Sequence, residues 1–307
     1  MIEPVILIGI MCGLGAAFFQ ACSYFASRNF LHRCTGRSRV LFGIGHFQMG
    51  LAAVAAFPFL LDGPLPPISE WWLQLAATSG FYLSAQRLLF LTLKKTDSSV
   101  VAPLLGLKIP LLGIISVAFL GTQLPLGAWL AVILCTAAAF LVSPPRGLPE
   151  IRGLVLILLT CLGYCGSDIF IPRLVEKIAP ASNHPNLLGV SMTYIVCGVV
   201  GLATAWHQKA FTIPRVQRYA VPYSFTWLTG MCFLFATFST VGVIFGNMLQ
   251  STRGLISVFI AVLVLRLGWR GIESRTSRGI FWLRLGGATL MTAGIVLYYV
   301  AKLRFQY

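Results

Sequence analysis

The sequence predicts an all-α integral membrane protein with ten transmembrane helices, arranged as two inverted five-helix repeats. Three observations support this fold class: the composition, the length of the apolar runs and an internal similarity. Apolar residues make up 57% of the 307 residues and charged residues only 10%, with a mean hydropathy of +0.85. Because a soluble protein needs roughly a quarter of its residues charged, the composition excludes a soluble enzyme, a secreted disulfide scaffold and a disordered regulator.

Ten apolar segments are long enough to cross a membrane, since a hydrocarbon core about 30 Å thick needs about 20 helical residues. Pro- and Gly-rich stretches such as 62–67 and 143–147 separate them. The segments show no period-two alternation, which excludes a transmembrane β-barrel. They are residues 4–27, 39–60, 70–93, 98–119, 124–142, 152–172, 187–206, 219–243, 248–266 and 280–301.

Basic residues concentrate in alternate connections and predict the orientation of the chain. Most of the 23 Lys and Arg residues lie in or beside the connections that follow segments 1, 3, 5, 7 and 9, including Arg28, Arg33 and Arg37. Cytoplasmic loops carry this excess, so we expect odd-numbered loops in the cytoplasm and both termini outside. The net charge of +15 therefore reflects membrane topology and predicts no nucleic-acid partner.

The eight cysteines are scattered singly through apolar stretches and are interpreted as packing residues. Cys161 and Cys165 share a helix face, but no second Cys/His pair joins them. We therefore expect no metal site and no cofactor.

Similar sequences recur at the ends of the two halves of the chain. FLGTQLPLGAWL (119–130) ends segment 4 and enters segment 5, and RLGWRG (266–271) does the same between segments 9 and 10. ILCTAAAFLV (133–142) then matches TLMTAGIVLY (289–298) at an offset of 156 residues. The matches keep the same order along the chain, as an internal repeat requires.

A further match near the start of each half completes the repeat. Leu14-Gly15 and Leu162-Gly163 are 148 residues apart, which places Gln20 opposite Asp168. The repeats are residues 1–145 and 150–307. An odd number of segments in each gives them opposite orientations, as in many secondary transporters, whose binding site lies near the midplane.

Ten segments split five and five, with Leu-Gly at the 4–5 and 9–10 turns, resemble the drug/metabolite transporter superfamily, EamA-type branch. Members usually carry Glu after the Leu-Gly; this chain has Thr122 and Trp269 there. The resemblance implies that segments 1–4 and 6–9 enclose a central cavity, with segments 5 and 10 peripheral. Small residues at 137–139 and 286–287 permit close helix packing there, and a homodimer through these two segments resembles what the family shows.

Once the residues in and beside the connections are set aside, four charged residues remain within the predicted segments, where each costs roughly 2.5–3.5 kcal/mol to insert and marks a functional hypothesis. Lys108 lies ten residues into segment 4, about 15 Å deep at 1.5 Å per residue. Pro103 and Pro110 flank it and bend the helix. We interpret Lys108 as a cation on a cavity wall that contacts substrate; the alternative is a lysine neutralised by desolvation or paired.

Arg253 and Asp168 both fall in the outer third of the membrane. They form either a structural ion pair or an extracellular gate that breaks when the carrier opens outward. Arg87, two turns inside segment 3, is a further substrate-binding candidate, with snorkelling as its alternative. His46 is a proton-coupling candidate, and the alternative is a hydrogen-bonded packing histidine.

Neutral polar side chains in the segments add further candidates for substrate contact, although each could instead join helices. The set that we single out is Gln20, Tyr24 and Tyr82.

These features predict a secondary transporter that moves a small anionic or zwitterionic metabolite by alternating access. No Walker A sequence is present, and Lys108 and Arg253 favour a carboxylate or phosphate. The alternative is a flippase for a phosphate-bearing lipid or lipid-linked sugar. The sequence carries none of the clustered acids, metal ligands or nucleophile turns of an intramembrane enzyme. The compact chain indicates a bacterial inner membrane.

Overall fold

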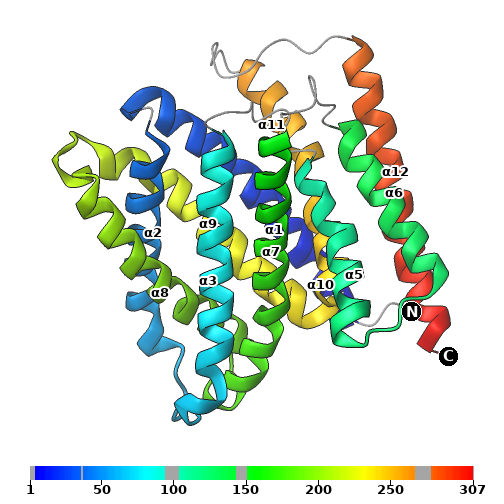
Figure 1. Cartoon of the computed structure of the whole chain (residues 1–307), viewed down its shortest axis with the longest axis horizontal. Helices are drawn as coiled ribbons and strands as arrows, with labels where there is room; N and C mark the ends of the chain where they lie inside the picture. Colours follow the sequence, from blue (N-terminus) through cyan, green and yellow to red (C-terminus); the bar gives the residue numbers. More distant parts are fainter. Residues whose placement is uncertain (1–3, 36, 94–103, 143–150, 267–277, 307) are drawn as a thin grey trace. The chain divides into compact units, whose positions relative to one another are not determined.

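The computed structural model describes residues 4–35, 37–93, 104–142, 151–266 and 278–306, and every regular element in these ranges is a helix (Figure 1). The α-helices are α1 Pro4–Phe30, α2 Ser38–Ala56, α3 Ile68–Leu93, α5 Lys108–Leu120, α6 Leu126–Val142, α7 Ile151–Ile178, α8 Pro185–His207, α9 Val216–Val241, α10 Val243–Ser251, α11 Arg253–Arg266 and α12 Arg278–Gln306. Short 3₁₀ or π turns extend several of them.

Within the described residues, each of the ten predicted segments is mainly helical, with two differences from the prediction. Helix α7 continues six residues beyond Pro172, because proline in a helix interior removes one hydrogen bond without having to end the helix. Segment 9 consists of two helices, α10 and α11, on either side of Thr252. The start of segment 4, residues 98–103, lies outside the described residues.

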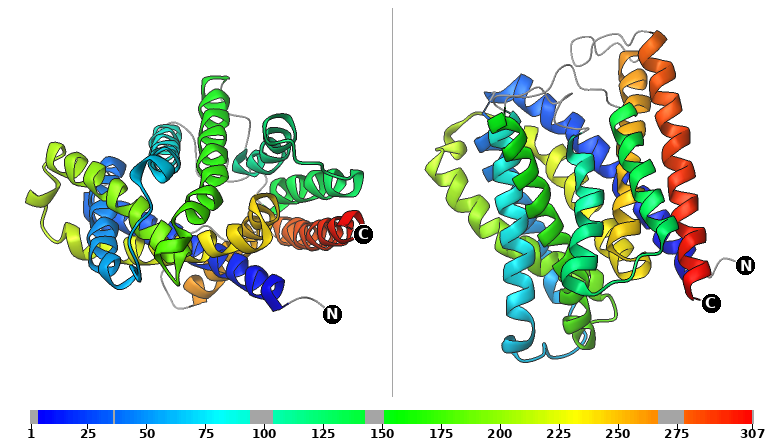
Figure 2. Two further views of the ribbon diagram at one scale, coloured as in Figure 1. Left: turned by 90° about the horizontal axis from the view of Figure 1, so that it is seen from below. Right: turned by 45° about the vertical axis from the view of Figure 1, so that its right-hand side comes forward.

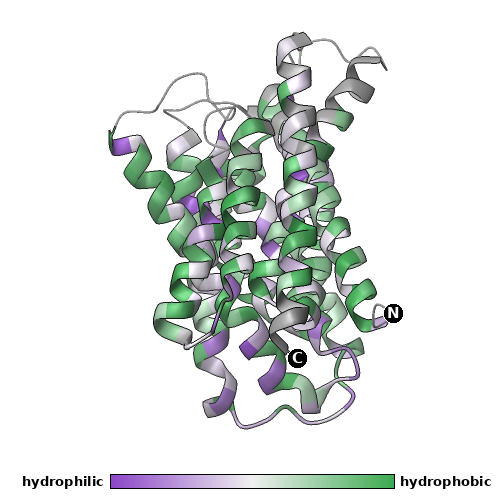
Figure 3. Ribbon diagram, turned by 90° about the vertical axis from the view of Figure 1, so that its right-hand side faces the viewer, coloured by the Kyte–Doolittle hydropathy of each residue, from purple (hydrophilic) through white to green (hydrophobic). Residues whose placement is uncertain are grey.

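The helices carry the exposed apolar surface of a multi-pass membrane protein. Within the described residues, five helical stretches are long and apolar enough to cross a membrane. Many large apolar side chains are exposed, such as Ile8, Met11 and Val199, an arrangement that water penalises and lipid favours. Apolar residues predominate along the helices (Figure 3). The five stretches are Pro4–Ser27, Ser38–Phe59, Ile151–Ala181, Pro185–His207 and Val216–Val241, and shorter apolar helices cover Leu105–Phe119, Leu126–Ala138 and Thr289–Ala301.

The chain divides into two compact units. The first comprises Met1–Leu83 and Gly166–Thr240, and the second comprises Ser84–Cys165 and Val241–Tyr307. Both units take helices from both halves of the sequence.

In the first unit, α2 and α8 pack antiparallel with their backbones in contact. A Cβ atom built on Gly50 would lie 2.5 Å from the Cα of Gly198, and one built on Gly198 would lie 2.6 Å from the Cα of Gly50. At the other end of the contact, a Cβ on Gly43 would lie 2.7 Å from the backbone nitrogen of Ala205. Glycine is required at this crossing because any side chain would separate the two helices.

In the second unit, α6 and α12 also pack antiparallel and lie side by side in both Figures 1 and 2. The Cys135 thiol lies 3.8 Å from the carbonyl oxygen of Met291. A Cβ on Gly127 would lie 2.9 Å from the Cβ of Ala301.

The first Leu-Gly turn of the repeat ends helix α5. Gly121 follows the helix with φ of +64°, a left-handed conformation in which only glycine avoids steric strain. The N–H of Thr122 then bonds to the carbonyl of Ser116 at 3.1 Å. The matching Leu267-Gly268 turn lies outside the described residues.

Candidate functional site

The predicted site residues divide between the two units. The first unit contains five of them and the second contains three. The first set is Gln20, Tyr24, His46, Tyr82 and Asp168, and the second is Arg87, Lys108 and Arg253.

Lys108 lies at an irregular junction in the second unit. A 3₁₀ turn, Leu105–Leu107, precedes it, and α5 begins at Lys108 itself. Pro110 has no N–H, so the carbonyl of Gly106 lacks its usual helical donor. Only 8% of the Lys108 residue surface is exposed. Because residues 94–103 lie outside the described residues, the expected depth of Lys108 in the membrane stays a prediction.

Helix α7 provides the surroundings of Lys108 in this unit. The ammonium nitrogen of Lys108 lies 5.4 Å from the centroid of the Tyr164 ring, within the range of a cation–π interaction. The Cys165 thiol lies 3.5 Å from the backbone carbonyl oxygen of Lys108. Thus neighbouring residues of α7 contact both the side chain and the backbone of Lys108.

The structure brings Arg253 to the same region of the second unit as Lys108. Arg253 is the half-buried first residue of α11. The Cys161 thiol on α7 lies in the electrostatic field of both Lys108 and Arg253. Both cations therefore act electrostatically on one residue of α7.

Arg87 differs from these two cations, because its side chain is exposed. This exposure suits the snorkelling alternative as well as substrate contact, so its role stays a prediction.

In the first unit, His46 belongs to a buried chain of polar side chains from α2, α3, α8 and α9. Its Nδ1 lies 2.8 Å from the carbonyl oxygen of Phe42 and its Nε2 lies 3.0 Å from the Tyr82 hydroxyl. A carbonyl can only accept, so Nδ1 carries the proton and the Nε2 of neutral His46 accepts from Tyr82. The indole N–H of Trp227 donates to the Tyr194 hydroxyl at 2.8 Å.

The rings of this chain are also in contact. The centroid of the Tyr82 ring lies 5.9 Å from that of Tyr194 and 6.3 Å from that of Trp227. With its ring nitrogens bonded and 0% of its surface exposed, His46 has the environment of a hydrogen-bonded packing histidine. Its coupling role remains a prediction.

The other candidates of the first unit lie on α1 and α7. Gln20 is buried and its amide nitrogen lies 3.8 Å from the sulfur of Met231 on α9, while Tyr24 is half-buried. Asp168 is 4% exposed. Pro172, four residues further along α7, cannot donate a hydrogen bond to the Asp168 carbonyl. The predicted pairing of Asp168 with Arg253 joins residues of different units and stays a prediction.

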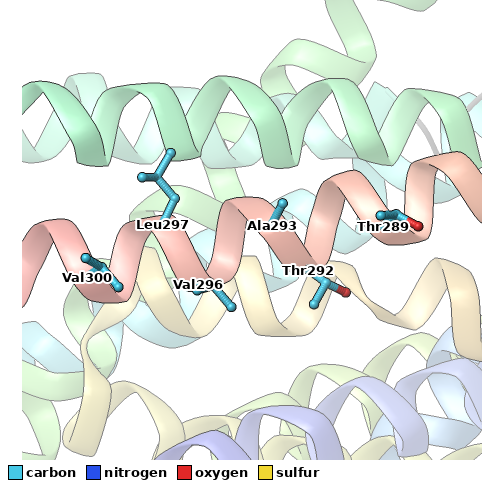
Figure 4. A pocket seen from close by; sticks show the side chains of 6 residues that line it. All are labelled: Thr289, Thr292, Ala293, Val296, Leu297 and Val300. Atoms are coloured by element: carbon cyan, nitrogen blue, oxygen red, sulfur yellow. The ribbon is translucent and has the colours of Figure 1, made fainter.

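An open groove along α12 differs in its lining residues from the surroundings of the two cations. Among the described residues that line it, the two threonines carry the polar side-chain groups and none is charged. Figure 4 shows its lining side chains, which all belong to α12: Thr289, Thr292, Ala293, Val296, Leu297 and Val300.

Within the described residues, no group of three or more His, Cys, Asp or Glu side chains is placed to hold a metal ion.

The sequence interpretation assigned no site role to several residues that the structure places beside the candidates. Tyr164 and the thiols of Cys161 and Cys165 surround the Lys108 turn, and Trp227 extends the His46 chain. Their polar atoms within apolar segments could have indicated this from the sequence, because buried Trp and Tyr usually form hydrogen bonds through their polar ends.

Comparison with known proteins finds a family model that matches the first part of the chain. Residues 7–143 match the model of the EamA-like transporter family, which belongs to the drug/metabolite transporter superfamily. This part of the chain is EamA-like. The match supports the expected resemblance to drug/metabolite transporters over this part of the chain. No curated protein matches the sequence.

The fold itself recurs in a solved crystal structure. That structure is 14% identical to this chain, covers 99% of this chain and 99% of its own, and has a TM-score of 0.64. At this identity the likeness establishes a shared fold over the whole chain.

Proposed function

We propose that this EamA-like transporter moves a small anionic or zwitterionic metabolite by alternating access, with Lys108 and Arg253 as the groups that bind its negative charge. The main support is that the Lys108 ammonium lies against Tyr164 of α7 and that both cations act electrostatically on Cys161, three residues earlier in the same helix. Lys108 supplies a compact charge, and Arg253 supplies a planar fork that matches carboxylate or phosphate.

The electrostatics of a buried site favour an anion there. Two like charges in a medium of low effective dielectric repel each other, and an anion between them replaces this repulsion by two attractions. The Tyr164 ring lies against the ammonium and adds about 0.5–2 kcal/mol of cation–π attraction. The ring therefore supports a charged Lys108 without neutralising it.

The inverted repeat of residues 1–145 and 150–307 belongs to the same proposal. Gly50 and Gly198 differ by 148 residues, and Cys135 and Met291 differ by 156, which are the offsets of the sequence repeat. Residues that meet their own equivalents are expected on a two-fold axis. Antiparallel packing of equivalent helices also supports opposite orientations of the two halves.

The remaining features of the proposal rest on the basic residues of the loops, on the small residues of α6 and α12 and on the length of the chain. We place odd-numbered loops in the cytoplasm of a bacterial inner membrane and pair two copies through α6 and α12. A flippase for a phosphate-bearing lipid or lipid-linked sugar would use the same two cations for its head group.

The proposal is tested by the thermal stability of the purified protein with and without ligand. The panel contains inorganic phosphate, phosphorylated sugars, amino acids, nucleotide sugars, anionic lipids and quaternary amines. A ligand that binds the folded state raises its stability by mass action. We expect an anion to stabilise the wild type, and expect a much smaller effect on Lys108→Gln and Arg253→Gln.

Lys177→Gln is the matched control, because Lys177 is an exposed lysine near the end of α7. It should respond to the anion as the wild type does. Stabilisation only by cations, or equal responses of Lys108→Gln and wild type, would contradict the anion site. Stabilisation only by anionic lipids would favour the flippase.

A further inference from the structure

The backbone before Lys108 departs from a regular α-helix and leaves carbonyl oxygens to be satisfied in other ways. The N–H of Lys108 bonds to the carbonyls of Leu105 and Gly106. In a regular α-helix it would bond to Leu104, four residues earlier. The Leu104 carbonyl therefore does not receive its usual donor.

Two thiols on one face of α7 lie at these carbonyls. The Cys161 sulfur lies 3.8 Å from the carbonyl oxygen of Leu104 and 4.0 Å from that of Leu105. The Cys165 sulfur lies 3.5 Å from the carbonyl oxygen of Lys108. The two thiols thus bracket the 3₁₀ turn, with one donor before it and one at its end.

Tyr164 lies on the same side of α7 as Cys161, since residues three and four apart are neighbours on a helix surface. Its ring lies against the Lys108 ammonium. Three contacts from adjacent positions of α7 therefore fix the backbone of one turn and the end of its lysine side chain. Both cysteines have 0% of their surface exposed, so water does not compete for their S–H donors.

We propose that Cys161 and Cys165 are positioning residues, whose thiols hold the turn from Leu104 to Lys108 and so aim the Lys108 ammonium at its ligand. The role in binding rests on the proposed function. Each S–H donor is weak, yet the two act on the same turn. Because the ammonium must meet its ligand with correct geometry, a small displacement of the turn weakens binding.

The position of the Lys108 side chain can be measured without any ligand. The chain has six lysines, so protein labelled with ¹³C at lysine Cε gives a simple NMR spectrum, and the signal lost in Lys108→Gln belongs to Lys108. The ring current of Tyr164 shifts this signal. We expect the double variant Cys161→Ala/Cys165→Ala to move it toward the position of the exposed lysines, and expect Cys161→Ser/Cys165→Ser to keep it.

Serine keeps a donor at nearly the volume of alanine, so this pair of variants isolates the hydrogen bond from the lost packing. Cys135→Ala controls for removal of a buried thiol, because Cys135 contacts the carbonyl of Met291 on α12 in the same unit. It should leave the Lys108 signal unchanged. An unmoved Lys108 signal in the double alanine variant overturns the positioning role.

Titration of the same samples with inorganic phosphate tests the consequence for binding. We expect the dissociation constant to rise roughly fivefold in the double alanine variant, as loss of about 1 kcal/mol implies, and to return to the wild-type value with serine. If the NMR signal moves but neither phosphate nor any other anion binds the wild type, the proposed function fails while the positioning of Lys108 is upheld. If anion affinity is unchanged although the signal moves, the link from the thiols to binding is refuted.

Discussion

Replacing Gly50 by alanine tests the backbone contact between α2 and α8. The new Cβ atom would lie 2.5 Å from the Cα of Gly198 and 3.1 Å from the carbonyl oxygen of Tyr194. Two carbon atoms in contact prefer about 3.5–4.0 Å, so the helices must separate by about 1 Å. The obstacle is backbone, which no rotamer change can move aside.

The expected cost follows from two opposing effects. Forcing an extra carbon into a packed contact destabilises by typically 1–3 kcal/mol. Replacing glycine by alanine within a helix stabilises the folded state by about 0.5–1 kcal/mol. We therefore expect Gly50→Ala to lower the free energy of unfolding by about 1–2 kcal/mol, and expect Gly198→Ala, which meets the Cα of Gly50 at 2.6 Å, to do the same.

Reversible denaturant unfolding in detergent micelles, followed by circular dichroism, measures this change. Gly80→Ala on α3 is the control, because nothing lies within 4 Å of a Cβ atom built there; this variant should be unchanged or slightly more stable. The double variant Gly50→Ala/Gly198→Ala should lose less than the sum of the single losses, since the first methyl has already separated the helices. The reasoning is refuted if Gly50→Ala is as stable as Gly80→Ala.

Three further substitutions test other contacts by the same unfolding measurement. Tyr82→Phe leaves the Nε2 of His46 without its donor and should cost about 1–3 kcal/mol; an unchanged stability would contradict this hydrogen bond. Trp227→Phe removes the N–H donor to Tyr194 and should cost at least about 1 kcal/mol. Gly121→Ala forces a side chain into the left-handed region at the end of α5 and should cost about 1–2 kcal/mol, whereas Gly279→Ala, in open space on α12, should not.

The helices could be predicted from sequence because apolar runs of membrane length leave few alternatives to a helix. Their ends were less predictable. Pro172 ends the predicted segment 6, yet α7 continues to Ile178, because the effect of one missing hydrogen bond depends on what surrounds the helix. The break at Thr252 lies in a short polar stretch, residues 250–253, inside an otherwise apolar segment, and polar residues alone do not specify that a helix ends.

The site was predictable only as a set of residue types. Lys108 and Arg253 can be singled out because a charge in an apolar segment is unusual. The residues that contact them cannot, because a local pattern does not say which helices pack together. Cys161 contacts carbonyl groups 56 and 57 residues earlier in the chain. Trp227 meets Tyr194 across 33 residues. Such contacts depend on tertiary packing, which a single sequence does not specify.

The crossing of α2 and α8 has a mechanical consequence for any transport cycle. Gly50 belongs to the first sequence half and Gly198 to the second, yet their backbones are in direct contact. A displacement of residues 1–145 as one piece against residues 150–307 would have to pull these backbones apart. Closely packed interfaces resist continuous deformation. In the proposed transport cycle, the parts that move against each other are therefore expected to differ from the two proposed sequence repeats.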